Sequence, residues 1–174
     1  MNMKIEAIRE GIAVLKPLYN DQGDICEIIT ESGESFHDRR SIKSVRRALA
    51  RNQALDFAAQ GAIVSRMLGR GGILPFYLDN SRIYVPFNMR KPLAANDYCY
   101  GYVRLDQITD IEKCQDIPHI RLSNGRLLQL NSTLSGARQN LEMGRRLAGM
   151  LGSAADEEEL LLQAVKVILA WLKK

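Results

Sequence analysis

Residues 119–141 read HIRLSNGRLLQLNSTLSGARQNL, two short apolar runs around Asn124-Gly125 that lead into a helical pattern. An Asn-Gly pair between apolar runs is a strong signal for a β-hairpin, and it predicts a type I′ turn with positive φ at both central residues. From Thr133 to Leu151 apolar residues recur at helical spacing, which predicts a helix with one inward face. Hairpin followed by helix indicates an antiparallel sheet with helices packed on it.

Other apolar runs, separated by turn residues, precede this stretch. Strands are predicted at residues 12–15, 25–29, 73–78, 82–87 and 98–105. Pro75 and Pro86 each remove a backbone donor, so their strands are expected at an edge of the sheet or at a bulge. The predicted fold class is therefore α+β: an antiparallel β-sheet with packed helices and a C-terminal amphipathic helix.

Two helices are predicted in the first half of the chain. Ser41 can cap a helix that turns Ile42, Val45 and Leu49 inward. The second helix has the predicted inward residues Leu55, Ala59, Ala62, Ile63 and Met67. It is expected to end at the glycines of residues 69–72, which follow a helix and lack the Gly-Lys-Ser/Thr ending of a phosphate loop.

A last helix is predicted from Asp156 to the end of the chain, after GMLGSAA at residues 149–155, which is interpreted as a short flexible joint. Its apolar residues cover more than one face, a pattern that fits either dimerisation or burial against the body. The predicted division is an α+β domain at residues 1–152 and a C-terminal helix at 153–174 as a candidate oligomerisation element.

The charge is unevenly distributed along the chain. The net charge is only +4, yet residues 20–38 hold six acids and no Lys or Arg, while residues 39–70 hold eight basic residues and Asp56 as the one acid. The acids that usually intersperse a solvated helix face are missing from this basic segment. Clustered Lys and Arg are what a polyanion site requires, because each neutralised phosphate releases a counterion.

Enzyme chemistry is not indicated. The three cysteines, Cys26, Cys99 and Cys114, match neither a disulfide framework nor a zinc pair, and are expected to be reduced and mostly buried. The two histidines stand beside no nucleophile motif, and no cofactor or metal site is predicted. The N-terminus resembles no signal peptide, and the longest apolar run is too short to span a membrane, so a cytoplasmic protein is expected.

From Gly72 onward the order of features resembles the competence transcription factors of the ComK type. The corresponding segments are Ile73-Leu74-Pro75, Val85-Pro86-Phe87, Tyr100-Gly101-Tyr102-Val103, Ser123-Asn124-Gly125-Arg126 and the helix from Thr133. The resemblance covers about residues 55–150. Cys99 is displaced from the family position, Tyr102 stands where Trp is usual, and the loop after Pro86 is longer.

This resemblance implies a transcriptional activator that binds A/T-rich duplex DNA through the minor groove as a homo-oligomer, a dimer or higher. Minor-groove readout depends on shape and needs inserted Arg and Lys more than a set of base-reading side chains. The predicted DNA-binding residues are Lys43, Arg46, Arg47, Arg51, Arg66, Arg70, Arg90, Lys91, Arg121 and Arg126. The alternative is a non-enzymatic protein-interaction module whose basic segment pairs with the acidic stretch 20–38 of its own chain or of a neighbour.

Overall fold

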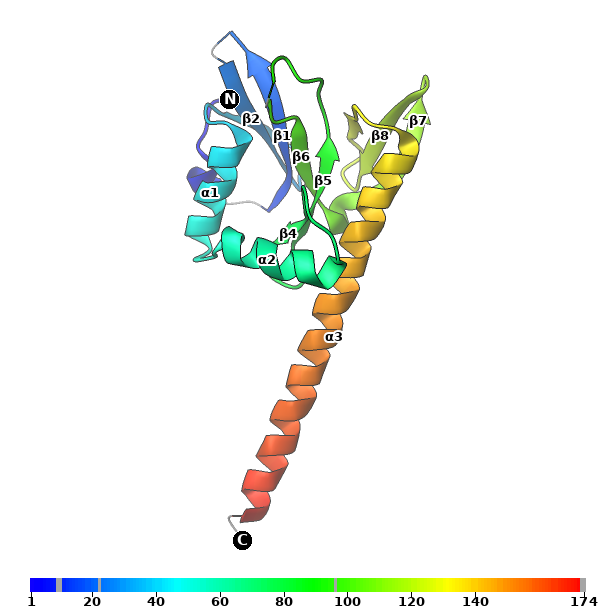
Figure 1. The fold of residues 1–174 in the computed structure, drawn as a ribbon. Coiled ribbons are helices and arrows are strands. Elements are labelled where there is room, and N and C mark those ends of the chain that lie inside the picture. The colour runs from blue at the N-terminus through cyan, green and yellow to red at the C-terminus, as the bar shows by residue number, and fades with distance from the viewer. Residues whose placement is uncertain (9–10, 22, 96, 173–174) are drawn as a thin grey trace.

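The structure is a computed structural model that describes residues 1–8, 11–21, 23–95 and 97–172. Its centre is a six-stranded sheet in the order β3-β2-β1-β6-β5-β4, in which every neighbouring pair is antiparallel (Figure 1). The strands are β1 (Ile12–Asn20), β2 (Gly23–Thr30), β3 (Ser35–Asp38), β4 (Phe76–Tyr77), β5 (Ile83–Asn88) and β6 (Tyr100–Arg104). Together with the helices described below, this sheet confirms the α+β prediction.

A three-stranded sheet follows in the order β7-β8-β9. Its strands are β7 (Ile108–Cys114), β8 (Ile117–Leu122) and β9 (Leu127–Gln129). The predicted hairpin at Asn124-Gly125 joins β8 to β9, but the predicted type I′ turn is wrong. Within the loop Ser123-Asn124-Gly125 positive φ occurs at Gly125 alone, at 82°, so this is a loop with a single glycine in the left-handed region.

The two-residue turn with positive φ at both positions lies one hairpin earlier. Gln115 has φ of 50° and Asp116 has φ of 64°, and they connect β7 directly to β8. Neither residue is a glycine. The Asn-Gly signal for a two-residue turn with positive φ therefore could not indicate the β7–β8 hairpin.

Helix α1 (Ile42–Asn52) covers one face of the six-stranded sheet. Ile42, Val45 and Leu49 are buried as predicted, in a core that they share with Leu15 of β1 and Ile28 of β2. Successive residues of a strand point to opposite faces, so Val14, the residue before Leu15 in β1, belongs to the core on the other side of the sheet. Both faces of the sheet are therefore covered.

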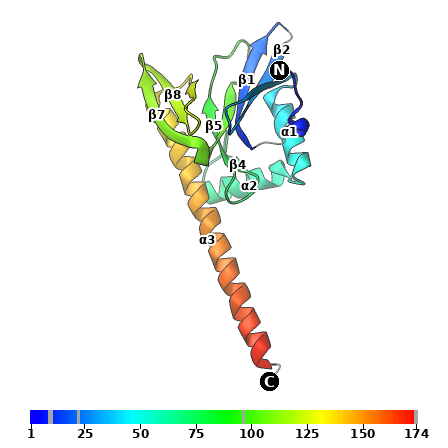
Figure 2. The ribbon, with the colours of Figure 1, turned by 180° about the vertical axis from the view of Figure 1, so that it is seen from behind.

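Helix α3 (Leu134–Leu172) and the small sheet cover that other face, as the rear view shows (Figure 2). Ala137 and Leu141 of α3 pack there with Val85 of β5 and Ile120 of β8. The helix passes close to β5 at Gly144, where a Cβ atom would stand 2.4 Å from Val85 Cγ2. A glycine is thus required for the observed approach of helix and sheet.

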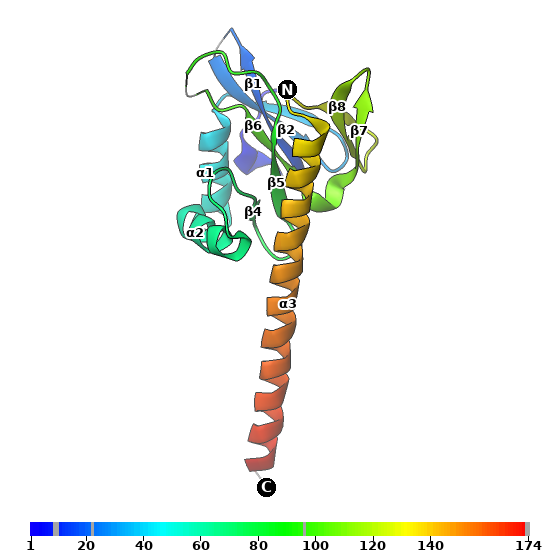
Figure 3. The same cartoon turned by 45° about the vertical axis from the view of Figure 1, so that its right-hand side comes forward.

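The predicted joint at residues 149–155 is wrong, because α3 continues through it as one helix of 39 residues. Glycine lowers helix propensity by about 1 kcal/mol without necessarily ending a helix, and the Ala, Leu and Glu residues around it are strong helix formers. Beyond the body the helix projects away on its own (Figure 3). Leu160, Leu161, Leu162 and Val165 on this projecting part are exposed.

Helix α2 (Phe57–Leu68) ends at Gly69, in the left-handed conformation, as predicted. Its predicted inward face is wrong: Ile63 is 42% exposed, and the buried residues are Gln60, Val64 and Leu68. The side chain of Gln60 donates to the backbone oxygen of Tyr77 and accepts from its backbone nitrogen, at 2.8 and 3.0 Å. A polar residue is turned inward because it completes the hydrogen bonding of the edge strand β4.

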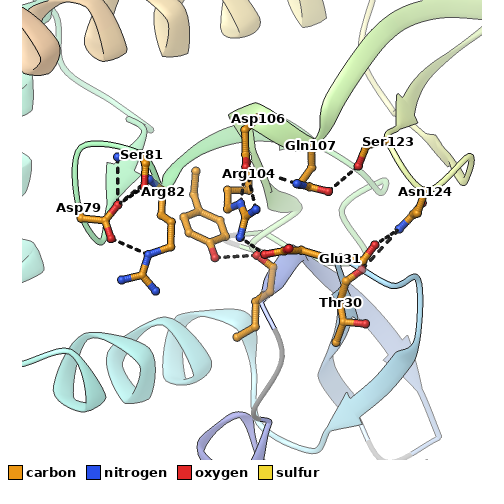
Figure 4. A network of polar contacts seen from close by, with 12 residues as sticks. Thr30, Glu31, Asp79, Ser81, Arg82, Arg104, Asp106, Gln107, Ser123 and Asn124 are labelled. Carbon is orange, nitrogen blue, oxygen red and sulfur yellow. Dashed lines mark hydrogen bonds and ion pairs between the residues drawn. The ribbon is translucent and has the colours of Figure 1, made fainter.

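A polar seam joins the two sheets (Figure 4). Arg104 is 6% exposed and binds both carboxylate oxygens of Asp106, at 2.6 and 2.7 Å, and also forms an ion pair with Glu31. Across the seam, the side-chain amide of Asn124 donates to the backbone oxygen of Glu31 at 3.3 Å. The hairpin at 123–125 is thereby fastened to the turn between β2 and β3.

Candidate nucleic-acid interface

Four cations of α1, which we call the α1 basic face, lie on one side of that helix: Lys43, Arg46, Arg47 and Arg51. Their spacing of three, four and eight residues from Lys43 keeps them together while the buried side packs on the sheet. Lys43, Arg47 and Arg51 extend from that side toward solvent. Across the part of the chain that the structure describes, none of the four forms an ion pair.

Arg46 is held more firmly than its three neighbours. Its guanidinium carbon lies 4.3 Å from the ring centroid of Tyr102, 4.8 Å from that of Phe76 and 5.6 Å from that of Phe57. Its Nη1 donates to the hydroxyl of Tyr102 at 2.8 Å, while its Nε is buried without a hydrogen-bond partner. Aromatic faces attract the cation but leave its full charge available to an anion.

Arg40, at the start of the basic segment, is neutralised. It binds the buried Asp38 and, on its other side, both carboxylate oxygens of Glu6. The hydrogen bonds from Arg40 lower the pKa of Glu6 to about 2. For Asp38, burial opposes ionisation, but the side-chain and backbone hydrogen bonds from Arg40 and the backbone hydrogen bond from Ile5 outweigh it and lower the pKa.

The acidic stretch 20–38 forms its other ion pairs elsewhere. Asp24 pairs with Arg90, Glu27 with Lys16, and Glu31 with Arg104. Among the described residues, Asp38 with Arg40 is the one ion pair that connects this stretch to the basic segment. Pairing within the chain therefore leaves the α1 basic face charged.

The remaining predicted residues fall into two groups. Arg66, Arg70 and Lys91 make no ion pair in the described ranges, and all three are exposed. Arg66 lies in the last turn of α2, and Arg70 follows that helix beside Arg138 and Arg146 of α3. These three cations lie outside α1, so the structure does not gather all ten predicted residues on one element.

Arg90 and the two hairpin arginines are engaged within the protein. Arg90 binds both oxygens of Asp97 at 2.7 Å and reaches Asp24 at 3.0 Å, and its side chain is 13% exposed. Arg121 pairs with Glu112. These contacts give Arg90 and Arg121 a carboxylate partner that the α1 cations lack.

Arg126 points back toward the large sheet, where its Nη1 donates to the backbone oxygen of Gly33 at 3.0 Å. This contact lies beside the bond from Asn124 to Glu31, so the arginine helps to fasten the hairpin to the turn before β3. The hairpin of the opening stretch is therefore a structural connection between the two sheets.

The α1 basic face borders a hollow of about 880 Å³. Phe57 at the start of α2 and Tyr98 before β6 supply aromatic walls that were not among the predicted site residues. The sequence did contain a signal for Tyr98, namely the period-two spacing of Tyr98, Tyr100 and Tyr102, which places three aromatic rings on one face of a strand. The hydroxyls of Tyr98 and Tyr102 are 2.6 Å apart, and the Nζ of Lys43 lies 5.0 Å from the ring centroid of Tyr98.

The described residues contain no group of three or more His, Cys, Asp or Glu side chains placed to hold a metal ion. Cys26 and Cys99 are buried, Cys114 is half-buried, and all three are free thiols, as predicted. Within the described ranges, every helix is too short or too polar to cross a membrane.

In comparisons with known proteins, no family model, no curated protein and no solved structure matches this chain. The resemblance to ComK-type factors accordingly stays a prediction from the sequence.

Proposed function

We propose that this protein binds double-stranded DNA through the α1 basic face and regulates transcription as an activator. The observation that carries the proposal is the set of four cations on α1 without a carboxylate partner in the described structure. Such cations can neutralise phosphates without first breaking an internal ion pair. Arg66, Arg70 and Lys91 can extend the contact. The role assigned here is binding, with no catalytic step.

The preference for A/T-rich DNA and for the minor groove is the part of the proposal supported by the resemblance. It agrees with the chemistry of the surface, since Arg and Lys are the residues that a narrow, electronegative groove attracts. We expect tighter binding to an A/T-rich duplex than to a G/C-rich duplex of equal length. Equal affinity for both would remove the minor-groove part and leave only general phosphate binding.

The decisive experiment is an anisotropy titration of the full chain with a labelled A/T-rich duplex. Lys43→Ala with Arg47→Ala should weaken binding more than Arg121→Ala with Arg126→Ala, although each pair removes the same charge. The reason is that Arg121 and Arg126 already have partners inside the protein. A dominant effect of the hairpin pair would place the docking surface elsewhere, and absence of binding at low salt would refute the function.

Salt dependence gives a second readout. Four phosphate contacts predict a slope of about −3.6 for log affinity against log salt, or roughly a hundredfold loss between 50 and 200 mM. Removal of both Lys43 and Arg47 should make the slope less negative by about 1.8. An unchanged slope in this variant would show that the two residues do not contact phosphates.

The same proposal includes self-association through the projecting part of α3. Leu160, Leu161 and Leu162 are 65%, 70% and 55% exposed on a helix that has left the body, and exposed leucines at this density indicate an unfilled interface. Truncation after Gly152 should give a smaller oligomer by light scattering, in a chain that still folds and melts cooperatively. An unchanged oligomer would assign self-association to another surface.

A further inference from the structure

The hollow beside α1 is open to solvent and has the volume of a small-molecule site. Its volume of about 880 Å³ lies within the range of ligand pockets, roughly 300–1,000 Å³. All four residues of the α1 basic face line it, together with Phe57 and Tyr98. A convex duplex can contact its rim, but a hollow of this volume can also hold a whole free ligand.

The lining of the hollow is mainly cationic, which indicates that the ligand is anionic. Among the described residues that line the hollow, Asp56 is the one acid. That carboxylate is engaged as the N-cap of α2, where it accepts hydrogen bonds from the backbone nitrogens of Ala58 and Ala59 at 2.8 and 3.0 Å. Four cations without an ion pair in the described structure, against one capping acid, fit a ligand with several negative charges, such as a chain of phosphates.

Arg46 supplies the strongest indication that the site is built for an anion. Its guanidinium is half-buried among three rings, so its position is fixed before any ligand arrives. A half-buried charge without a counter-charge is costly, and an anion in the hollow would relieve that cost. Fixed orientation also reduces the entropy lost on binding.

The apolar side chains of the lining indicate that the ligand also has an apolar part. Ala50, Leu55, Phe57 and Tyr98 line the same hollow, and Lys43 lies over the ring of Tyr98. Aromatic and aliphatic walls beside cations suit a planar ring joined to phosphates, because a base stacks on aromatic side chains whatever its identity.

We propose that the hollow between α1 and the start of α2 binds a nucleoside polyphosphate, with its phosphates on the α1 basic face and its base against Phe57 and Tyr98. The ligand and duplex DNA then use the same cations, so each weakens the binding of the other by the same factor. This site goes beyond the proposed DNA function and does not depend on it.

The test is calorimetric titration of the full chain at low salt with ATP, inorganic triphosphate and adenosine as probes. ATP should bind at least about fivefold more tightly than triphosphate, which corresponds to the lower limit for stacking one base. Adenosine alone should give no measurable heat. If ATP and triphosphate bind equally, the nucleoside part of the proposal is wrong, and if neither binds, the site is wrong.

Matched variants locate the site. Lys43→Gln with Arg47→Gln should weaken ATP at least about tenfold, since one charge-assisted hydrogen bond contributes that much. Arg66→Gln with Arg70→Gln removes the same charge from residues that do not line the hollow, and should change affinity less than about twofold. Equal losses in both pairs would mean nonspecific attraction and would overturn the proposal. Circular dichroism checks that each variant is folded.

The two proposals fail separately. DNA binding without ATP or triphosphate binding would refute the nucleotide site and leave the DNA function intact. ATP binding that obeys the variant pattern, in a chain that binds no duplex, would refute the DNA function and support the nucleotide site. Where both bind, ATP should displace the labelled duplex, and simultaneous binding without competition would show that the ligand does not occupy the α1 basic face.

Discussion

Replacing Gly144 by alanine should destabilise the fold, although alanine is the better helix former. The new Cβ would lie 2.4 Å from Cγ2 of Val85, well inside the roughly 3.5–4.0 Å at which two carbon atoms pack best. Val85 is fully buried in the core between α3 and the large sheet, so it has little room to move. Overpacking of this kind typically costs about 1–3 kcal/mol.

The expected magnitude follows from two opposing effects. Alanine in place of glycine gains about 1 kcal/mol of helix propensity, which leaves a net loss of up to about 2 kcal/mol for Gly144→Ala. Gly149 lies in the same helix, and a Cβ atom there would meet nothing within 4 Å, so Gly149→Ala should gain up to about 1 kcal/mol. The same substitution at two positions of one helix should thus have opposite signs.

Urea denaturation followed by circular dichroism measures both variants, with stability taken from midpoints at constant m value. Val85→Ala in the Gly144→Ala background removes the clashing methyl group, so the double variant should be more stable than the sum of the two single changes predicts. Stabilisation by Gly144→Ala would refute the close approach. No gain from Gly149→Ala would favour the flexible joint over the continuous helix.

Further outcomes concern two turns, one ion pair and one hairpin contact. Gly125→Val should cost at least about 1 kcal/mol because φ there is 82°, whereas Asp116→Gly, at φ of 64°, should gain up to about 1 kcal/mol in the same urea assay. The lowered pKa of Glu6, about 2 against 4.5, means that its ion pair stabilises the fold above pH 4.5 and is lost as pH falls toward 2. Because that side chain is 35% exposed, Glu6→Gln should cost roughly 1 kcal/mol at about pH 6, and the difference should vanish below about pH 2. Arg126→Ala should cost about 1 kcal/mol through its lost bond to Gly33, while Arg121→Ala, which removes an exposed ion pair, should stay within about 0.5 kcal/mol.

Local patterns in the sequence were sufficient to predict an element and its buried face where the apolar residues lie on one face only. Ile42, Val45 and Leu49 are apolar on an otherwise charged helix, so the buried face of α1 had one solution, and the structure confirms it. The hairpins β1–β2, β4–β5 and β8–β9 followed for the same reason, since apolar runs bounded by turn residues have few alternatives, whereas strands β3 and β7 were not predicted. The edge position expected for the Pro75 segment agrees with β4, the last strand of the sheet. The same expectation for Pro86 is wrong, because Pro86 lies in β5, between β6 and β4, and the register of β5 with β6 runs through it without a bulge.

The same approach failed where a tertiary contact outweighs local preference. The predicted face of α2 was wrong because its Ala-rich side suits either environment, and the decisive contact joins Gln60 to a strand 17 residues away. Continuity of α3 was missed because glycine weakens a helix without ending it when its neighbours are strong helix formers. The spacing of apolar residues predicts neither the contact of Gln60 with β4 nor the continuity of α3.

The sequence shows which residues are basic, but only the structure shows which of them are already paired inside the protein. Arg90 and Lys91 are adjacent and look equivalent in the sequence, yet Arg90 is bound by Asp97 and by Asp24, 66 residues away, while Lys91 is exposed. The density of basic residues along the chain therefore overstates the charge that a ligand can meet. If all ten predicted residues contacted phosphates, the salt slope would be near about −9, whereas the α1 basic face alone gives about −3.6. A measured slope between these values would count how many of Arg66, Arg70 and Lys91 join the contact, because these cations need break no internal ion pair of the described structure to do so.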